Sequence, residues 1–187
     1  LLRAEEVQQQ WLLQHRPGTV EHYDHQALWE FKKSVWKRHP RLLHHVSQMR
    51  IQMLYELQIA AGYPEQEARS GAEQAFEVFF AERNRVVLFD DATPALAFLA
   101  ARFPVVALSN GNADVGRMGL GHFFRASLSA ERLGFGKPDA RIFEAAAVAV
   151  GVQAHEVLHI GDDAALDVLG ALACGMQTVW VNREDHL

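Results

Sequence analysis

The strongest constraint in this chain is a change of hydrophobic pattern near residue 85. Beyond it, four short apolar runs have the character of strands, at residues 105–108, 126–128, 157–160 and 178–181. Helical patterns lie between these runs, near residues 94–102, 113–120, 139–150 and 164–174. Alternating strands and helices indicate a parallel sheet with helices on both faces. Residues 86–187 are therefore predicted to form a Rossmann-like α/β core.

The first half of the chain has helical periodicity only. Apolar residues three or four positions apart predict four helices, which are interrupted at Pro17, at Pro40 and between Gly62 and Pro64. No alternating pattern of the strand type occurs there. Residues 1–85 are therefore predicted to form a separate helical domain.

Composition excludes several classes of protein. The 187 residues carry a formal net charge of −5 and have a pI of about 6.0, which argues against a nucleic-acid binder that relies on a basic field. No apolar run of membrane-spanning length occurs. Cys174 is the single cysteine, and with no export signal visible it favours a reducing, cytoplasmic setting. We expect a monomer or homodimer without nucleic-acid or membrane partners.

One stretch of the helical half is purely basic. Residues 31–55 contain no acid but six cations, which are Lys32, Lys33, Lys37, Arg38, Arg41 and Arg50. A solvated helix face explains such a stretch, because charge is usual at surfaces. The alternative is an electropositive surface that attracts an anionic substrate.

In the second half, polar residues lie at or just beyond the carboxyl ends of predicted strands, which is where α/β folds place their sites. Ser109, Asn110 and Gly111 come directly after residues 105–108. A hydroxyl and several main-chain N–H groups in such a turn can bind an anion, although a plain turn explains the same residues. Lys137 and Pro138 precede a predicted helix, where the lysine ammonium can face a phosphate.

Three carboxylates follow the run at 157–160. They are Asp162, Asp163 and Asp167, and acids at the tip of a buried strand are costly unless a positive group lies nearby. Mg²⁺ suits this position, because it uses one or two protein carboxylates with water and substrate phosphate. The alternative is a helix N-terminus carrying acids, which the helix dipole favours and which fits Asp163 better than Asp162.

The order of these motifs resembles motifs II, III and IV of the haloacid dehalogenase superfamily. The matching strings are Ser-Asn-Gly, Gly-Lys-Pro-Asp and Gly-Asp-Asp-x-x-x-Asp, and the resemblance covers about residues 86–182. The helical half resembles the four-helix, C1-type cap that this family inserts after its first motif. The strings LSNGNAD and LHIGDDAALDVLGALACGMQTVWVN are most similar to the branch that contains flavin mononucleotide phosphatases.

The resemblance implies two sets of roles. Ser109, with the amides near Asn110 and Gly111, would hold the phosphoryl group, and Lys137 would steady the nucleophile and the phosphate. Asp162 would bind Mg²⁺ directly, while Asp163 and Asp167 would act through metal-bound water or by fixing the lysine. We therefore assign catalytic roles to Lys137, Ser109 and Asp163, and metal binding to Asp162 and Asp167.

The first motif of this family, an apolar strand ending in Asp-x-Asp, has no match in the chain. Residues 86–93 look similar, but they have Ala92 where the second acid is needed and they follow the helical half instead of preceding it. We therefore expect the nucleophile and the general acid to lie upstream of Leu1. Their strand would lie between those carrying Ser109 and Asp162.

These features favour a Mg²⁺-dependent phosphatase that forms an aspartyl-phosphate. Its substrate would be a small phosphorylated metabolite, such as flavin mononucleotide or another nucleotide or sugar phosphate. One alternative is a metal-free 2-haloacid dehalogenase, which would not need the acids at 162–167. The other is a non-catalytic binding domain with the same fold.

Overall fold

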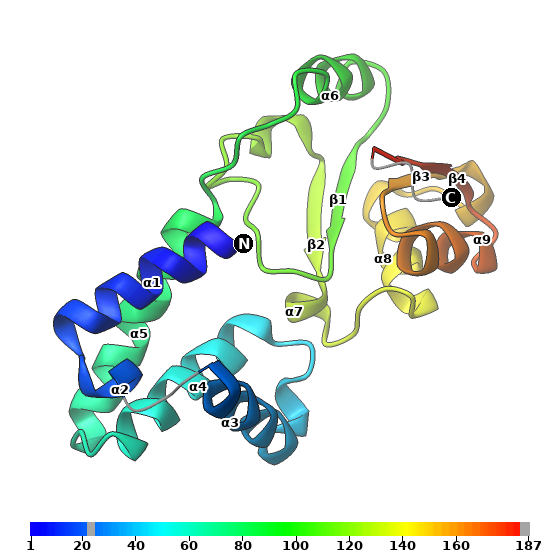
Figure 1. The fold of residues 1–187 in the computed structure, drawn as a ribbon. Helices are drawn as coiled ribbons and strands as arrows, with labels where there is room; N and C mark the ends of the chain where they lie inside the picture. Colours follow the sequence, from blue (N-terminus) through cyan, green and yellow to red (C-terminus); the bar gives the residue numbers. More distant parts are fainter. Residues whose placement is uncertain (22–24, 184–187) are drawn as a thin grey trace. The chain divides into compact units, whose positions relative to one another are not determined.

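The computed structural model describes residues 1–21 and 25–183. The chain divides into two compact units, Leu1–Val87 and Leu88–Leu187, so the boundary lies two residues after the predicted one. Figure 1 shows helices in the first unit, and strands together with helices in the second. Among the described residues, every helix is too short or too polar to traverse a lipid bilayer.

The first unit contains four longer helices, as the periodicity predicts, and two short helical turns. In chain order they are α1 (Leu2–His15), α2 (Gly18–Glu21), α3 (His25–Arg38), the 3₁₀ turn η1 (Pro40–Leu42), α4 (Val46–Ala60) and α5 (Glu65–Arg83). The interruptions follow the residues that break helices: Pro17 precedes α2, Pro40 opens η1, and Gly62 has a φ of 87° after α4.

Small residues let the helices of this unit approach closely. Ala72 and Ala75 of α5 are fully buried and form one apolar cluster with Leu12 of α1 and Leu54 of α4. A second cluster joins α3 to α4 through Val35, Met49 and Met53. The helical unit thus has a core of its own, which is what an independent domain requires.

The second unit contains four strands, each within one residue of its predicted bounds. Its elements are α6 (Ala92–Ala100), β1 (Val106–Ser109), η2 (Gly121–Phe123), β2 (Ala126–Ser129), α7 (Ala130–Leu133), α8 (Ala140–Val150), η3 (Ala154–Glu156), β3 (Leu158–Gly161), the π-helical turn η4 (Ala164–Leu169), α9 (Gly170–Ala173) and β4 (Gln177–Trp180).

The helix predicted near residues 113–120 is wrong. These residues form turns before the short η2. Asp114 Oδ1 accepts hydrogen bonds from the N–H groups of Gly116 (2.7 Å) and Arg117 (3.0 Å), and Gly119 has a φ of 76°. An aspartate that binds main-chain N–H groups two and three residues ahead stabilises a turn in competition with a helix.

The strands pair in parallel, as predicted, but they form two separate two-stranded sheets. β1 pairs with β2, with Ser109 opposite Ser129, and β3 pairs with β4, with Gly161 opposite Trp180. The expectation that residues 157–160 form a buried strand is wrong for one face of β3, because Leu158 is 51% exposed and Ile160 is 45% exposed. Within the described residues β3 has one neighbouring strand, so its second edge and one apolar face lack cover.

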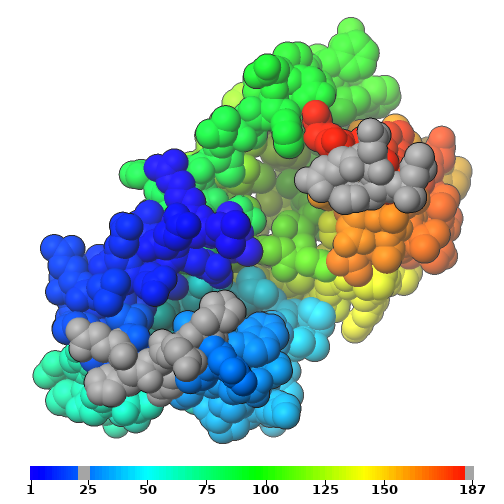
Figure 2. Space-filling view, viewed as in Figure 1, coloured from blue at the N-terminus to red at the C-terminus, as the bar shows by residue number. Residues whose placement is uncertain are grey.

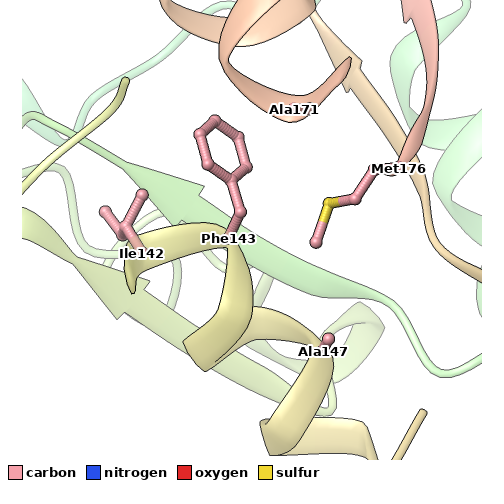
Figure 3. Close-up of a cluster of buried hydrophobic side chains, with 5 residues drawn as sticks. All are labelled: Ile142, Phe143, Ala147, Ala171 and Met176. Carbon is pink, nitrogen blue, oxygen red and sulfur yellow. The ribbon is translucent and has the colours of Figure 1, made fainter. Parts of the chain in front are cut away.

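Helix α8 packs with elements of both sheets. It contacts β1, β2 and α9, and its buried residues Ile142, Phe143 and Ala147 meet Ala171 and Met176 (Figure 3). Replacing a buried phenylalanine such as Phe143 with alanine costs about 3–5 kcal/mol. This core fixes α8 against β1 and α9, and the motifs predicted to carry chemistry lie beside these elements.

Candidate active site

Ser109 is the last residue of β1, whereas the sequence predicted that it lies directly after that strand. Its Oγ accepts a hydrogen bond from the Gly111 N–H at 3.0 Å. A serine hydroxyl has one donor and two acceptor positions, so the O–H remains able to donate to an anion. The Gly111 amide, expected to bind substrate, here donates to Ser109.

The side chain of Asn110 binds the main chain of Lys137 twice. Its Nδ2 donates to the Lys137 carbonyl at 2.8 Å, and its Oδ1 accepts from the Lys137 N–H at 2.7 Å. Gly136 allows this approach, because a Cβ at that position would lie 2.7 Å from Asn110 Oδ1. The carboxamide therefore joins the end of β1 to the loop that carries the lysine.

The helix after Lys137 begins one residue later than predicted. The Lys137–Pro138 peptide bond is cis, and α8 starts at Ala140 with Asp139 as its N-cap. Asp139 Oδ1 accepts from the Arg141 N–H at 3.0 Å. Pro138 thus lies before the cap instead of in the first turn, and Asp139 satisfies an N–H group that the helix leaves unpaired.

Lys137 forms a mostly buried ion pair with Asp167. Its Nζ lies 2.5 Å from Asp167 Oδ1, and the two side chains are 13% and 4% exposed. His159 Nε2 lies 3.0 Å from the same oxygen, and the Asp163 N–H donates to Oδ2 at 3.2 Å. Burial raises the pKa of Asp167, but the hydrogen bonds from Lys137 and His159 and the lysine charge hold that pKa below its ordinary value.

Gly161, the residue that ends β3, leaves room for this carboxylate. A Cβ at position 161 would lie 2.3 Å from Cγ of Asp167 and 2.5 Å from its Cβ and Oδ2. Such distances cannot be accommodated without movement of one of the two segments. The glycine of the Gly-Asp-Asp string therefore has a steric role in the ion pair.

Asp163 caps the helical turn η4. Its Oδ1 accepts from the N–H groups of Ala165 (2.9 Å) and Leu166 (2.8 Å). This is the arrangement that the helix N-terminus alternative predicts for this residue.

Asp162 differs from its two neighbours in the acid cluster. It is exposed, and its main-chain carbonyl accepts from Trp180 Nε1 at 3.0 Å, but its carboxylate has no hydrogen bond or ion pair with another described residue. Within residues 1–21 and 25–183, no group of three or more His, Cys, Asp or Glu side chains is arranged to hold a metal ion. Since Mg²⁺ needs only one or two protein carboxylates, Asp162 fits as a ligand, whereas both oxygens of Asp167 already accept hydrogen bonds.

Several cations of the basic stretch 31–55 have acidic partners. Arg38 pairs with Glu56, and His39 Nε2 lies 2.6 Å from the same side chain. Arg50 pairs with Glu5 at 3.1 Å, which joins α4 to α1. These contacts support a structural role for part of the stretch.

The same stretch also contributes to the surface of the helical unit. Atoms of α3 form part of the surface seen in Figure 2. In this helix Trp36 is 45% exposed, and the neighbouring Trp29 is 55% exposed with Lys33 over its ring. Lys37 and Arg41 are exposed as well. A hollow of about 420 Å³ beside α3 is lined by Arg38, His39, Pro40, Arg41 and Leu42.

The segment 86–93, which looks similar to the missing first motif, is not a strand. Residues 85–89 have no regular secondary structure, and Ala92 begins α6. Asp91 pairs with Arg183 at 2.7 Å. The rejected interpretation of this segment as a nucleophile motif therefore has no support from its geometry.

Sequence reasoning missed His159, which it treated as part of an apolar run. The signal that could have identified it is the period of two along β3. Leu158 and Ile160 point to one face of a strand, whereas His159 and Gly161 point to the other. An ionisable side chain on the same face as the glycine of a Gly-Asp-Asp string is expected to meet the acids that follow.

The sequence matches the haloacid dehalogenase-like hydrolase family over residues 5–175. It is 31% identical over 185 residues to the 5-amino-6-(5-phospho-D-ribitylamino)uracil phosphatase YigB of Escherichia coli, covering 99% of this chain and 77% of that protein. It is 38% identical over 133 residues to a phosphoserine phosphatase of Thermus thermophilus, covering 68% of this chain and 51% of that protein.

A similar solved structure is a 2-haloacid dehalogenase from Pseudomonas syringae pv. Tomato DC3000. It has a TM-score of 0.90 and 34% sequence identity to this chain, and the alignment covers 98% of this chain and 82% of that one. The relatives thus include phosphatases and a dehalogenase with the same fold.

Proposed function

Because the chain belongs to the haloacid dehalogenase-like hydrolase family, we propose that it is a phosphomonoesterase acting on a small phosphorylated metabolite. One observation carries this proposal. Contacts between Asn110 and Lys137, and between Lys137 and Asp167, join three motifs that lie far apart in the sequence. Together, a hydroxyl, an ammonium and a carboxylate from these motifs suit phosphoryl transfer, where positioning and charge neutralisation supply most of the catalysis.

The phosphate side of the site would be formed by Ser109 and Lys137. The serine O–H donates to one phosphoryl oxygen. Of the three N–H groups on the lysine ammonium, one is directed to Asp167 and two are left for the phosphate and the nucleophile. Their joint effect is to neutralise charge that moves onto the phosphoryl oxygens during transfer.

The metal side of the site would be formed by Asp162. Mg²⁺ bound there would neutralise a phosphate oxygen as a Lewis acid. In this proposal Asp163 caps η4, and Asp167 acts by fixing Lys137, which is one of the two roles expected for it. Asp162 is then the carboxylate of the cluster that remains for the ion.

The nucleophile and the general acid would be two aspartates of a strand upstream of Leu1. One carboxylate attacks phosphorus as the bond to the leaving oxygen breaks, and the other donates a proton to that oxygen. Water then hydrolyses the aspartyl-phosphate and releases inorganic phosphate. Among the described residues β1 and β3 each pair with one strand, and their open second edges support a further strand between them.

The helical unit would act as a cap that selects the leaving group. The first substrates to test are flavin mononucleotide and the compound in the name of the Escherichia coli relative. Both carry a phosphorylated ribityl chain on a nitrogen heterocycle.

A 2-haloacid dehalogenase is the second candidate, favoured by the 0.90 TM-score of the Pseudomonas syringae structure. Its substrate is a carboxylate, which the unpartnered charge of Asp162 would repel. The deciding experiment compares phosphate release from phosphomonoesters with Mg²⁺ against halide release from 2-chloropropionate in EDTA, using the full natural protein. Phosphate release alone supports the proposal, and halide release alone overturns it.

A further inference from the structure

His159 is a mostly buried imidazole at the candidate site. It lies in β3, and its side chain is 11% exposed. The ring packs edge-on against Phe143 of α8, with centroids 5.3 Å apart and an interplanar angle of 85°. Nε2 lies 3.0 Å from Asp167 Oδ1, so the ring links the core of α8 to the carboxylate that binds Lys137.

The direction of this hydrogen bond follows from the chemistry of its partner. An ionised carboxylate has acceptors only, and Lys137 Nζ already donates to the same Oδ1. Nε2 of His159 must therefore carry a hydrogen and donate it. Asp167 is then held by three donors from three segments, namely the lysine, the histidine and the Asp163 N–H.

We propose that His159 is a positioning residue that acts through Asp167 on Lys137. The inference rests on the proposed function, in which the lysine ammonium contacts the phosphoryl group. The Asp163 N–H contact is the longest of the three, at 3.2 Å, so it restrains the carboxylate least. Without the histidine donor, Asp167 would accept hydrogen bonds only from the flexible lysine and from the more distant Asp163 N–H, so the orientation of its carboxylate would be less well defined.

Sharing Oδ1 also affects the lysine itself. Two donors divide the charge of one carboxylate oxygen, so the ammonium is attracted less strongly to Asp167 than in an isolated pair. Partners that hold a binding side chain in its productive orientation are typically important for catalysis without contacting the substrate. His159 meets this description, since its contact is with the carboxylate and not with the phosphate site.

The first test compares two substitutions at position 159 in the full natural protein. His159→Gln keeps an N–H donor at about the position of Nε2, whereas His159→Leu has similar size and no donor. We expect kcat to fall by about 10–100-fold in the leucine variant and to recover to within about threefold of wild type in the glutamine variant. KM should change less than kcat in both variants.

Phe143→Leu is the matched control, because it removes the ring contact of His159 and keeps the donor. It should lower the thermal midpoint and leave kcat near the wild-type value. Equal loss of kcat in H159Q and H159L would overturn the inference, and so would full activity in H159L.

A double-mutant cycle separates action through Lys137 from an independent role. If His159 acts through the lysine, H159L added to K137A should change kcat by less than about twofold, because coupled residues are not additive. If the two losses multiply, the inference is wrong.

A structural readout distinguishes this inference from the proposed function. Crystal structures should retain the Lys137–Asp167 contact in H159Q and show a displaced carboxylate or ammonium in H159L. An unmoved pair in H159L overturns the inference, whatever the activity. Absence of phosphatase activity in the wild type with Mg²⁺ overturns the proposed function, while the structural comparison still decides the role of His159.

Discussion

Lys137 and Asp167 are thirty residues apart in the chain and form an ion pair with 2.5 Å between Nζ and Oδ1. Both side chains are largely shielded from water. Removing one partner of a buried pair leaves an uncompensated charge and costs about 3–5 kcal/mol, whereas replacing both with neutral groups costs much less. Substitution of the lysine alone therefore changes stability together with any catalytic role, and the two effects must be separated.

Substitution of Lys137 should abolish most of the activity because the charge of its ammonium is lost from the site, and not because the protein unfolds. K137M should lower kcat/KM by at least about 100-fold, as expected for a principal electrostatic stabiliser. It should also lower the free energy of unfolding. The double variant K137M/D167N should recover much of that free energy, measured by urea denaturation, but none of the activity.

The control for Lys137 is an exposed cation of the same unit. Arg125 is exposed, and Arg125→Ala should leave both kcat/KM and stability near the wild-type values. If K137M/D167N regained activity along with stability, the lysine would have only a structural role.

Gly161 should not tolerate even a methyl group. A Cβ there would lie 2.3 Å from Asp167 Cγ, so Gly161→Ala should displace the carboxylate and cost about 1–3 kcal/mol of stability, as overpacking does. Activity should fall as well, because Lys137 loses its fixed partner. Gly121→Ala is the control, since its nearest contact would be 3.4 Å from the Gly116 Cα. Equal behaviour of the two variants in thermal melting and kinetics would contradict the steric role of Gly161.

Asn110 should act on the loop that carries the lysine. Asn110→Ala removes two hydrogen bonds to the Lys137 main chain and should destabilise the protein by about 1–3 kcal/mol, because partly buried N–H and C=O groups lose their partners. Asn110→Asp keeps an oxygen that accepts from the Lys137 N–H, but it has no N–H group to donate to the Lys137 carbonyl. The aspartate variant should therefore recover only part of the stability that the alanine variant loses. Chemical denaturation of both variants measures this. An aspartate variant as stable as the wild type would show that the contact to the carbonyl contributes nothing.

The hydrophobic pattern of the sequence predicted the strands correctly, but it did not predict the contacts between the motifs. Strands β1 and β3 follow from short apolar runs bounded by turn residues, and the helix at 113–120 failed because Asp114 stabilises a turn that periodicity does not register. The pairing of Asn110 with Lys137 spans 27 residues. Such long-range contacts depend on how α8 packs, and no local pattern encodes that.

The acid cluster illustrates the same limit within six residues. The sequence favoured a capping role for Asp163 over Asp162 but did not fix the environment of each acid. Among the described residues, the Asp162 carboxylate is exposed without a partner, Asp163 caps η4 and Asp167 is buried against Lys137. The difference arises from the geometry of the turn after β3, which directs each side chain to a different environment.

Acid should remove the stability that Asp167 contributes. Burial raises the pKa of this carboxyl, but the hydrogen bonds from Lys137 and His159 and the lysine charge lower it below the unfolded value of about 3.9. A carboxyl with a lowered folded pKa stabilises the protein above its unfolded pKa, and the contribution disappears as pH falls through the folded pKa. The difference in unfolding free energy between wild type and D167N should therefore be constant near neutral pH and shrink below about pH 4. Urea denaturation over a pH series measures it, and a difference that stayed constant to pH 3 would contradict this assignment.

Removal of the metal should reveal which acid binds it. If Asp162 is the ligand, EDTA should abolish phosphatase activity and Mg²⁺ should restore it, because the phosphate charge is otherwise uncompensated. Asp162→Asn should raise the Mg²⁺ concentration needed for half-maximal activity by about 10-fold or more, since a neutral amide binds a hard cation more weakly than a carboxylate does.

Asp163→Asn is the matched control for the metal prediction, because asparagine is also a good N-cap and should keep η4 intact. Its requirement for Mg²⁺ should remain close to that of the wild type. Titrations of activity with Mg²⁺ for the two variants, side by side, give the comparison. If Asp163→Asn raised the Mg²⁺ requirement more than Asp162→Asn does, the ion would bind the capping carboxylate of Asp163, and the assignment of Asp162 would be wrong.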